Sequence, residues 1–118
     1  MFRVISKASV SEISNLVNTY HNDKERNNRM DKIYGIGIGK PLYSFIVDTA
    51  HYNGNEIHTI TDNGIIVIQN ERTKKLVTCL IARAGQIRRY FNNGIIPYNI
   101  NKVILIAIEH QKNGYNNW

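Results

Sequence analysis

Short apolar runs rich in β-branched residues alternate with polar connections through the middle of the chain. Residues 57–61 and 65–69 flank Asp62, Asn63 and Gly64, and residues 76–82 follow a second polar connection. Runs of this length bounded by turn residues are typical of antiparallel strands. Asn-Gly favours a hairpin because both residues tolerate the positive φ that a tight turn demands. The pattern therefore predicts three consecutive strands in a meander.

A fourth strand is predicted just before this meander. Residues 42–49 place Tyr43, Phe45 and Val47 on one face and more polar positions on the other, which indicates an edge or near-edge strand with one buried face. Residues 65–68 are apolar on both faces, so we expect that strand to be the most buried and to lie centrally.

Helical spacing dominates both ends of the chain. Near the N-terminus, Ser9 and Glu12 form a capping-box pattern. It is followed by apolar residues at helical spacing, namely Val10, Ile13, Leu16, Val17 and Tyr20. Beyond residue 82, the spacing of Ile87, Tyr90 and Phe91 predicts a short helix whose neighbouring polar side chains stay available.

The last segment, residues 100–112, predicts a buried C-terminal helix, although its core of residues 103–108 would also suit a strand. The tail after Gly114 is expected to be loose unless Tyr115 and Trp118 dock. Together these elements predict an α+β fold with an N-terminal helix, a four-stranded antiparallel meander and C-terminal helices, in a single domain spanning residues 1–118.

Two intervening segments carry weaker signals. Residues 22–32 mix both charge signs without apolar periodicity, which indicates a solvated helix end or an exposed loop. Residues 34–41 contain three glycines before Lys40 but match neither the phosphate-binding loop nor the dinucleotide fingerprint. We expect a flexible hinge there, or a close backbone approach to a ligand or to another strand, with Lys40 as a possible phosphate contact.

Composition narrows the functional classes. The single cysteine, Cys79, lies in an apolar strand and is predicted to be a buried structural thiol. The longest wholly apolar run has six residues, far fewer than the roughly 18 to 20 of a membrane helix, so we expect no membrane span and a cytoplasmic location. His51 and His58 lack metal-ligand spacing, and neither a metal site nor a cofactor is predicted.

Positive charge is concentrated in the meander and just after it. No carboxylate lies between residues 72 and 89, and the cations there equal the chain's net charge of +6; they are Arg72, Lys74, Lys75, Arg83, Arg88 and Arg89. A basic surface on a sheet is typical of proteins that bind RNA or a phosphate-containing nucleotide.

Candidate chemistry centres on His58, since histidine titrates near neutral pH. The alternation pattern groups His58 with Ile60 but leaves open which face of the sheet they occupy. His21 and His110 are interpreted as histidines near helix ends. A metal-independent cleavage of RNA would need His58 as acid or base, with His51 or Tyr90 as its partner. It would also need cations near the phosphate, drawn from Arg83, Arg88, Lys74 and Arg72.

The order of elements, the histidine in EIHTIT and the later strand KLVT resemble the BECR nuclease superfold of barnase, colicin ribonucleases and RelE-type toxins, in particular its small phage and mobile-element members. The resemblance covers roughly residues 8 to 91. It implies metal-independent RNA cleavage through the ribose 2′-hydroxyl. It also implies that His58 is the general acid or base and that Thr78 is a polar site residue of the last strand.

Two other functions are compatible with the same residues. The cationic residues Arg72, Lys74, Arg88 and Arg89, together with Gln86, Tyr90 and Phe91, would also suit a protein that binds or sequesters a nucleotide or nucleic acid without turnover. The basic face would also suit a protein-interaction or inhibitor module with an acidic partner. A homo-oligomer is compatible with all three.

Overall fold

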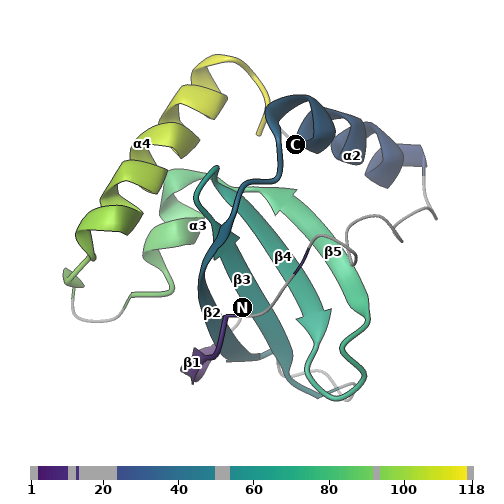
Figure 1. Cartoon of the computed structure of the whole chain (residues 1–118), viewed down its shortest axis with the longest axis vertical. Coiled ribbons are helices and arrows are strands. Elements are labelled where there is room, and N and C mark those ends of the chain that lie inside the picture. Colours follow the sequence, from purple (N-terminus) through teal and green to yellow (C-terminus); the bar gives the residue numbers. More distant parts are fainter. Residues whose placement is uncertain (1–2, 11–12, 14–23, 50–53, 92–93, 117–118) are drawn as a thin grey trace.

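The protein folds as an α+β structure around one five-stranded antiparallel sheet, which we describe from a computed structural model (Figure 1). The structure describes residues 3–10, 13, 24–49, 54–91 and 94–116. The strands lie in sequence order and are β1 Arg3–Ala8, β2 Pro41–Asp48, β3 Glu56–Thr61, β4 Ile65–Asn70 and β5 Leu76–Ile81. The helices are α2 Lys24–Ile36, α3 Ala84–Arg88 and α4 Tyr98–Lys112.

The predicted meander is present as β2 to β5, but the sheet has a fifth strand that the prediction lacked. β1 pairs antiparallel with β2, so that Arg3 lies opposite Asp48 and Lys7 opposite Phe45. Its register shifts at Ile5, which forms a bulge without a partner in β2. Because β1 takes the edge position, β2 is a near-edge strand, and β3 lies at the centre of the sheet with β4 next to it.

The predicted N-terminal helix does not match the described residues. Ser9, Val10 and Ile13 are not helical, and the rest of that prediction lies outside the described residues. Ile13 is nevertheless buried, as its place in the apolar pattern suggested. Helix α2 instead covers the segment that was expected to be a helix end or loop, because Met30 and Ile33 form a short apolar stripe against the sheet.

Each face of the sheet carries its own apolar cluster. On one face, α3 and α4 pack on β2, β3 and β4, and the cluster includes Phe45, Val47, Ile60, Ile66, Ile68, Ile87, Tyr90, Ile100, Val103 and Ile104. On the other face, α2 packs on β4 and β5, and the cluster contains Ile13, Met30, Ile33, Ile65, Val67, Cys79 and Ile81. Figure 1 shows the helices on these two sides. β4 contributes to both clusters, which explains why its residues are apolar on both faces.

The glycine-rich segment after α2 makes a close backbone approach to the β3–β4 turn. Gly39 has φ of 83°, and a Cβ there would collide with Asp62 and Asn63. The Lys40 N–H donates to Asp62 Oδ1 at 2.8 Å. Of the two interpretations from the sequence, the approach to another part of the sheet is the one present.

The β3–β4 turn also contacts both helical layers. The Asn63 side-chain amide donates to the carbonyl oxygens of Ile36 and Gly37 at the end of α2, at 3.0 and 2.7 Å. On the opposite side, His110 Nε2 donates to the Asn63 carbonyl at 2.9 Å from the last turn of α4. His110 is thus a helix-end histidine, as predicted, with a structural contact.

Both C-terminal helices occur where the sequence predicted them, and the segment after α4 is docked through Asn116. The buried Asn116 amide donates to the carbonyl oxygens of Ala82 and Ala107, at 2.9 and 3.2 Å. The tail is therefore docked up to this residue, and Tyr115, one of the two residues expected to dock it, meets the His110 ring edge-on at 6.0 Å. Among the described residues, none of the helices combines the length and apolar character needed to cross a bilayer.

Candidate functional site

His58 lies on the face of the sheet that α3 and α4 cover. Strand register places it in one transverse row, opposite Phe45 of β2 and Ile68 of β4, and Ile68 in turn lies opposite Thr78 of β5. Phe45 and Ile68 belong to the cluster under α3 and α4, and this settles the face that alternation left open. His58 and Thr78 therefore lie in the same row, two strands apart, which is about 10 Å.

Both ring nitrogens of His58 have hydrogen-bond partners. Nδ1 lies 2.6 Å from the Tyr90 hydroxyl oxygen, and Nε2 lies 3.0 Å from Glu56 Oε1. An ionised carboxylate only accepts, so Nε2 carries the proton and donates to Glu56. In the neutral tautomer Nδ1 then accepts from the Tyr90 hydroxyl. The three side chains form a carboxylate–imidazole–hydroxyl chain, which we call the Glu56–His58–Tyr90 chain.

Burial sets the protonation states of this chain. His58 and Tyr90 are each only 4% exposed. Burial lowers the pKa of His58, while the hydrogen bond and charge of Glu56 act in the opposite direction. The pKa of Tyr90 is raised by burial and by the negative charge of Glu56, and Arg89 opposes this effect. At neutral pH the chain therefore contains a neutral imidazole and a protonated phenol.

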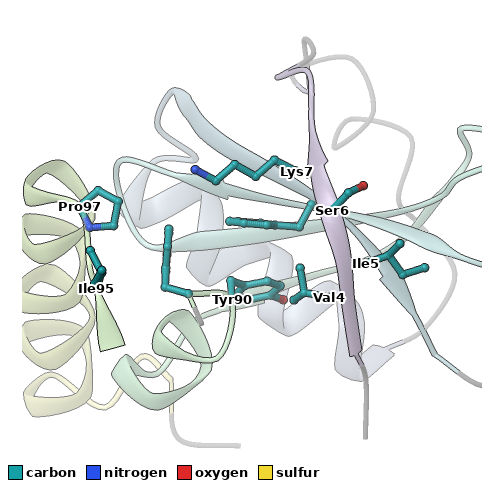
Figure 2. A pocket seen from close by; sticks show the side chains of 9 residues that line it. Val4, Ile5, Ser6, Lys7, Tyr90, Ile95 and Pro97 are labelled. Carbon is teal, nitrogen blue, oxygen red and sulfur yellow. The ribbon is translucent and has the colours of Figure 1, made fainter. Parts of the chain in front are cut away.

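Tyr90 also lines a groove of about 340 Å³ between β1 and the segment that follows α3 (Figure 2). The lining residues are Val4, Ile5, Ser6, Lys7, Phe45, Tyr90, Phe91, Ile95 and Pro97. Three of them are aromatic and in mutual contact: the Phe45 ring stacks on Tyr90 at 5.1 Å and meets Phe91 edge-on at 5.5 Å. Tyr90 thus joins the groove to His58.

The predicted cations divide into two groups at opposite ends of β5. Arg72, Lys74 and Lys75 are exposed in the β4–β5 connection, where Lys74 adopts φ of 62°. Arg88 and Arg89 are exposed at the end of α3. A single continuous cationic surface, as the sequence suggested, would have to extend along the length of β5.

Arg83 and Gln86 are engaged in local structure at the start of α3. The Arg83 Nε–H donates to the Asn116 carbonyl at 3.1 Å, and Gln86 Oε1 accepts the Arg83 main-chain N–H at 2.8 Å. These contacts help to fix both residues at the start of α3, and their role in binding a ligand stays a prediction. Thr78 also has a partner, because Arg29 Nη1 lies 3.4 Å from its hydroxyl at the edge of the sheet.

Several residues of the site were not singled out from the sequence. Glu56 precedes His58 by two positions on the same strand, so the period-two rule would have placed both on one face. Val4 and Lys7 belong to the strand that was missed, and no local pattern connects them to Tyr90.

Within the described parts of the chain, no three His, Cys, Asp or Glu side chains are grouped as metal ligands. Cys79 is buried as predicted, and burial raises the pKa of its thiol to about 12. His21 and His51 lie outside the described residues.

No family model, curated protein or solved structure matches this chain. The resemblance to the BECR superfold therefore stays a hypothesis.

Proposed function

We propose that the protein binds RNA on the α3 and α4 side of its sheet and cleaves it without a metal ion. The observation that carries this proposal is the Glu56–His58–Tyr90 chain, in which a carboxylate orients a buried imidazole that contacts the hydroxyl of Tyr90, a residue that lines the groove. A base held by a third group and hydrogen-bonded to a hydroxyl is a recurrent arrangement in acid–base catalysis. The resemblance drawn from the sequence supports the same activity and assigns the same histidine.

The proton transfers follow from the tautomer described above. The ribose 2′-hydroxyl gives its proton to the Tyr90 oxygen as the phenol proton moves to His58 Nδ1, and Glu56 stabilises the imidazolium that forms. The 2′-oxygen bonds to phosphorus and the bond to the 5′-oxygen breaks, giving a 2′,3′-cyclic phosphate. The leaving 5′-oxygen takes a proton from water, and His58 releases its proton through Tyr90 to solvent.

The exposed cations supply the electrostatic part of the proposal. Arg88 is the last residue of α3, Arg89 follows it and directly precedes Tyr90, and Lys7 lines the groove. Positive charge at these positions would hold the RNA backbone and oppose the negative charge that develops on phosphorus. Arg72 and Lys74 would contact phosphates farther along the RNA strand. Thr78, in the same row as His58, would supply a polar contact, and Arg83, exposed at the start of α3, would add positive charge.

A second candidate function is binding without turnover, favoured by the burial of His58. A histidine that is 4% exposed, with partners on both nitrogens, also meets the requirements of a structural core residue. In this case the groove and the cations would capture RNA or a nucleotide, and His58 would only hold Tyr90 in place.

The decisive experiment is incubation of purified protein with total RNA and with tRNA in EDTA. We expect products with 2′,3′-cyclic phosphate ends and no cleavage of DNA, which lacks the attacking hydroxyl. His58→Gln and Tyr90→Phe are expected to lower the cleavage rate about 10²- to 10⁴-fold, while RNA affinity stays within a few-fold. Intact RNA with retained binding would leave the binding function in place of the nuclease.

His110→Gln provides the matched control, because His110 is a second buried histidine with a hydrogen bond and lies at the β3–β4 turn. All variants are assayed well below their melting temperatures. Equal losses of rate in His58→Gln and His110→Gln would indicate a general effect of destabilisation. If the wild type binds no RNA or polyanion even at low salt, both nucleic-acid functions are wrong, and the protein-interaction module is the function that is left.

A further inference from the structure

We propose that the groove between β1 and the segment after α3 takes a nucleobase of the RNA strand. This inference rests on the proposed function, because it names the part of RNA that this site holds. The groove residues come from β1, from β2 and from the segment around α3 and α4, where they are Tyr90, Phe91, Ile95 and Pro97. The cations singled out in the sequence lie outside its lining.

The walls of the groove suit a planar ring. Phe91 is half-buried and offers accessible ring surface to the groove. Phe45 and Tyr90, only 1% and 4% exposed, stack on each other and support Phe91 from the core, where the Phe45 ring meets it edge-on. Val4, Ile95 and Pro97 add apolar lining. Stacking on aromatic side chains is the main way in which proteins hold unpaired bases, and it tolerates different base identities.

The floor on the β1 side offers main-chain polar groups. In Figure 2 the side chains of Ile5 and Ser6 point away from the groove, whereas those of Val4 and Lys7 point toward it. Ile5 and Ser6 therefore line it through their backbone. Ile5 is also the bulged residue without a partner in β2, and a bulge leaves its residue outside the regular hydrogen-bond ladder. Backbone donors and acceptors at this place suit the polar edge of a base.

The positive charge of Lys7 at the rim of the groove suits the phosphate of a nucleotide. Lys7 lines the groove, and its Nζ lies 5.5 Å from the centroid of the Tyr43 ring, which is outside the lining. This contact places the positive charge at the end of the groove, away from the aromatic cluster. A base in the groove with its phosphate at Lys7 would satisfy both regions. The volume of about 340 Å³ lies near the lower end of the roughly 300 to 1,000 Å³ of small-molecule sites, so one nucleotide unit is the appropriate size.

Occupancy of the groove would also position the reacting group. Tyr90 forms part of the groove wall and contacts His58 through its hydroxyl. A base stacked against this wall would bring its own ribose close to the Glu56–His58–Tyr90 chain. The groove would thus select which 2′-hydroxyl is presented.

The test is a titration of ¹⁵N-labelled protein with adenosine and uridine 5′-monophosphates, with ribose 5-phosphate and inorganic phosphate as base-free probes. We expect both mononucleotides to shift the amide signals of residues 4–7 and 90–91, with affinities at least tenfold above those of the base-free probes. Val4→Phe, which fills the groove, should weaken mononucleotide binding tenfold or more. Lys7→Ala should weaken it several-fold.

Two further variants guard against misfolding and nonspecific charge effects. Ile95→Asp changes a residue that is 77% exposed, so it leaves the core intact but puts a carboxylate at the groove, and it should weaken binding as Val4→Phe does. Lys32→Ala removes an exposed lysine from α2 on the other side of the sheet and should change nothing. Equal binding of mononucleotides and ribose 5-phosphate, or unchanged binding in both groove variants, would overturn the inference.

The cleavage assay and the mononucleotide titration together distinguish a wrong nucleobase site from a wrong nuclease activity. RNA cleavage that persists with unchanged affinity in Val4→Phe and Ile95→Asp would contradict the nucleobase site alone. Mononucleotide binding that depends on the groove, together with intact RNA in the cleavage assay, would contradict the nuclease alone.

Discussion

Replacement of Tyr90 by phenylalanine tests the central chain of the site with little change in packing. The ring would keep its stacking on Phe45 and its place in the core, and only the hydroxyl 2.6 Å from His58 Nδ1 would be lost. His58 would then have a buried nitrogen without this donor. Leaving one buried polar group unsatisfied costs about 1 to 3 kcal/mol. At about 4 °C per kcal/mol for a chain of this size, the melting temperature should fall by about 4 to 12 °C.

The assay is urea and thermal unfolding followed by circular dichroism at pH 7.5. Tyr98→Phe is the control, because Tyr98 is 76% exposed and should change the unfolding free energy by less than about 0.5 kcal/mol. A double-mutant cycle with His58→Ala isolates the pair and should give a favourable coupling energy of about 0.5 to 3 kcal/mol. A coupling energy near zero would refute the argument that the Tyr90 hydroxyl and His58 form a stabilising hydrogen bond.

Three further changes test other parts of the structure by the same unfolding measurements. Because burial lowers the pKa of His58, stability is complete above about pH 6.5 and falls as the pH drops from 6.5 through the lower folded-state pKa. His58 contributes at most about 1.4 kcal/mol of unfolding free energy per pH unit, and this contribution should disappear in His58→Gln. Identical pH profiles of stability in the two proteins would contradict the prediction. Gly39→Ala should destabilise the protein by more than about 1 kcal/mol, because Gly39 has a positive φ and a Cβ there would collide with the β3–β4 turn. As a control, Gly85→Ala in α3 should stabilise the protein slightly. No change in stability for Gly39→Ala would show that the loop can shift to accommodate the Cβ. Asn116→Ala removes two buried hydrogen bonds and should cost about 1 to 3 kcal/mol, and a smaller loss would show that the docked segment adds little.

The sequence predicted β2 to β5 because each of these strands has a strong local pattern and a turn signal at its ends. β1 has neither: RVISKA is mostly exposed, and only pairing with the distant β2 makes it a strand. Helix α2 was missed for a similar reason, since among its described side chains, residues 28–36, Met30 and Ile33 are the buried ones. Propensity and periodicity are local quantities, so they predict least where distant contacts decide the conformation.

In the candidate site, too, local sequence features were predicted and features that depend on distant contacts were not. His58 was singled out by residue type, and Tyr90 was named among its possible partners, but the face of the sheet was not decided by alternation. The contact between them joins β3 to the end of α3, and their burial follows from the packing of α3 and α4. The groove depends on β1, so it could not be predicted before that strand was known.

The single residue Asn63 connects the two helical layers through one hairpin turn. Its side chain binds the end of α2 and its carbonyl binds His110 of α4, while β4 contributes side chains to both apolar clusters. Unfolding of α2 or of α4 would therefore remove hydrogen bonds from the β3–β4 turn, and this turn also holds the other helix. The protein should lose both clusters in one cooperative transition, and native-state hydrogen exchange should report a single unfolding unit for α4, β4 and the C-terminal half of α2.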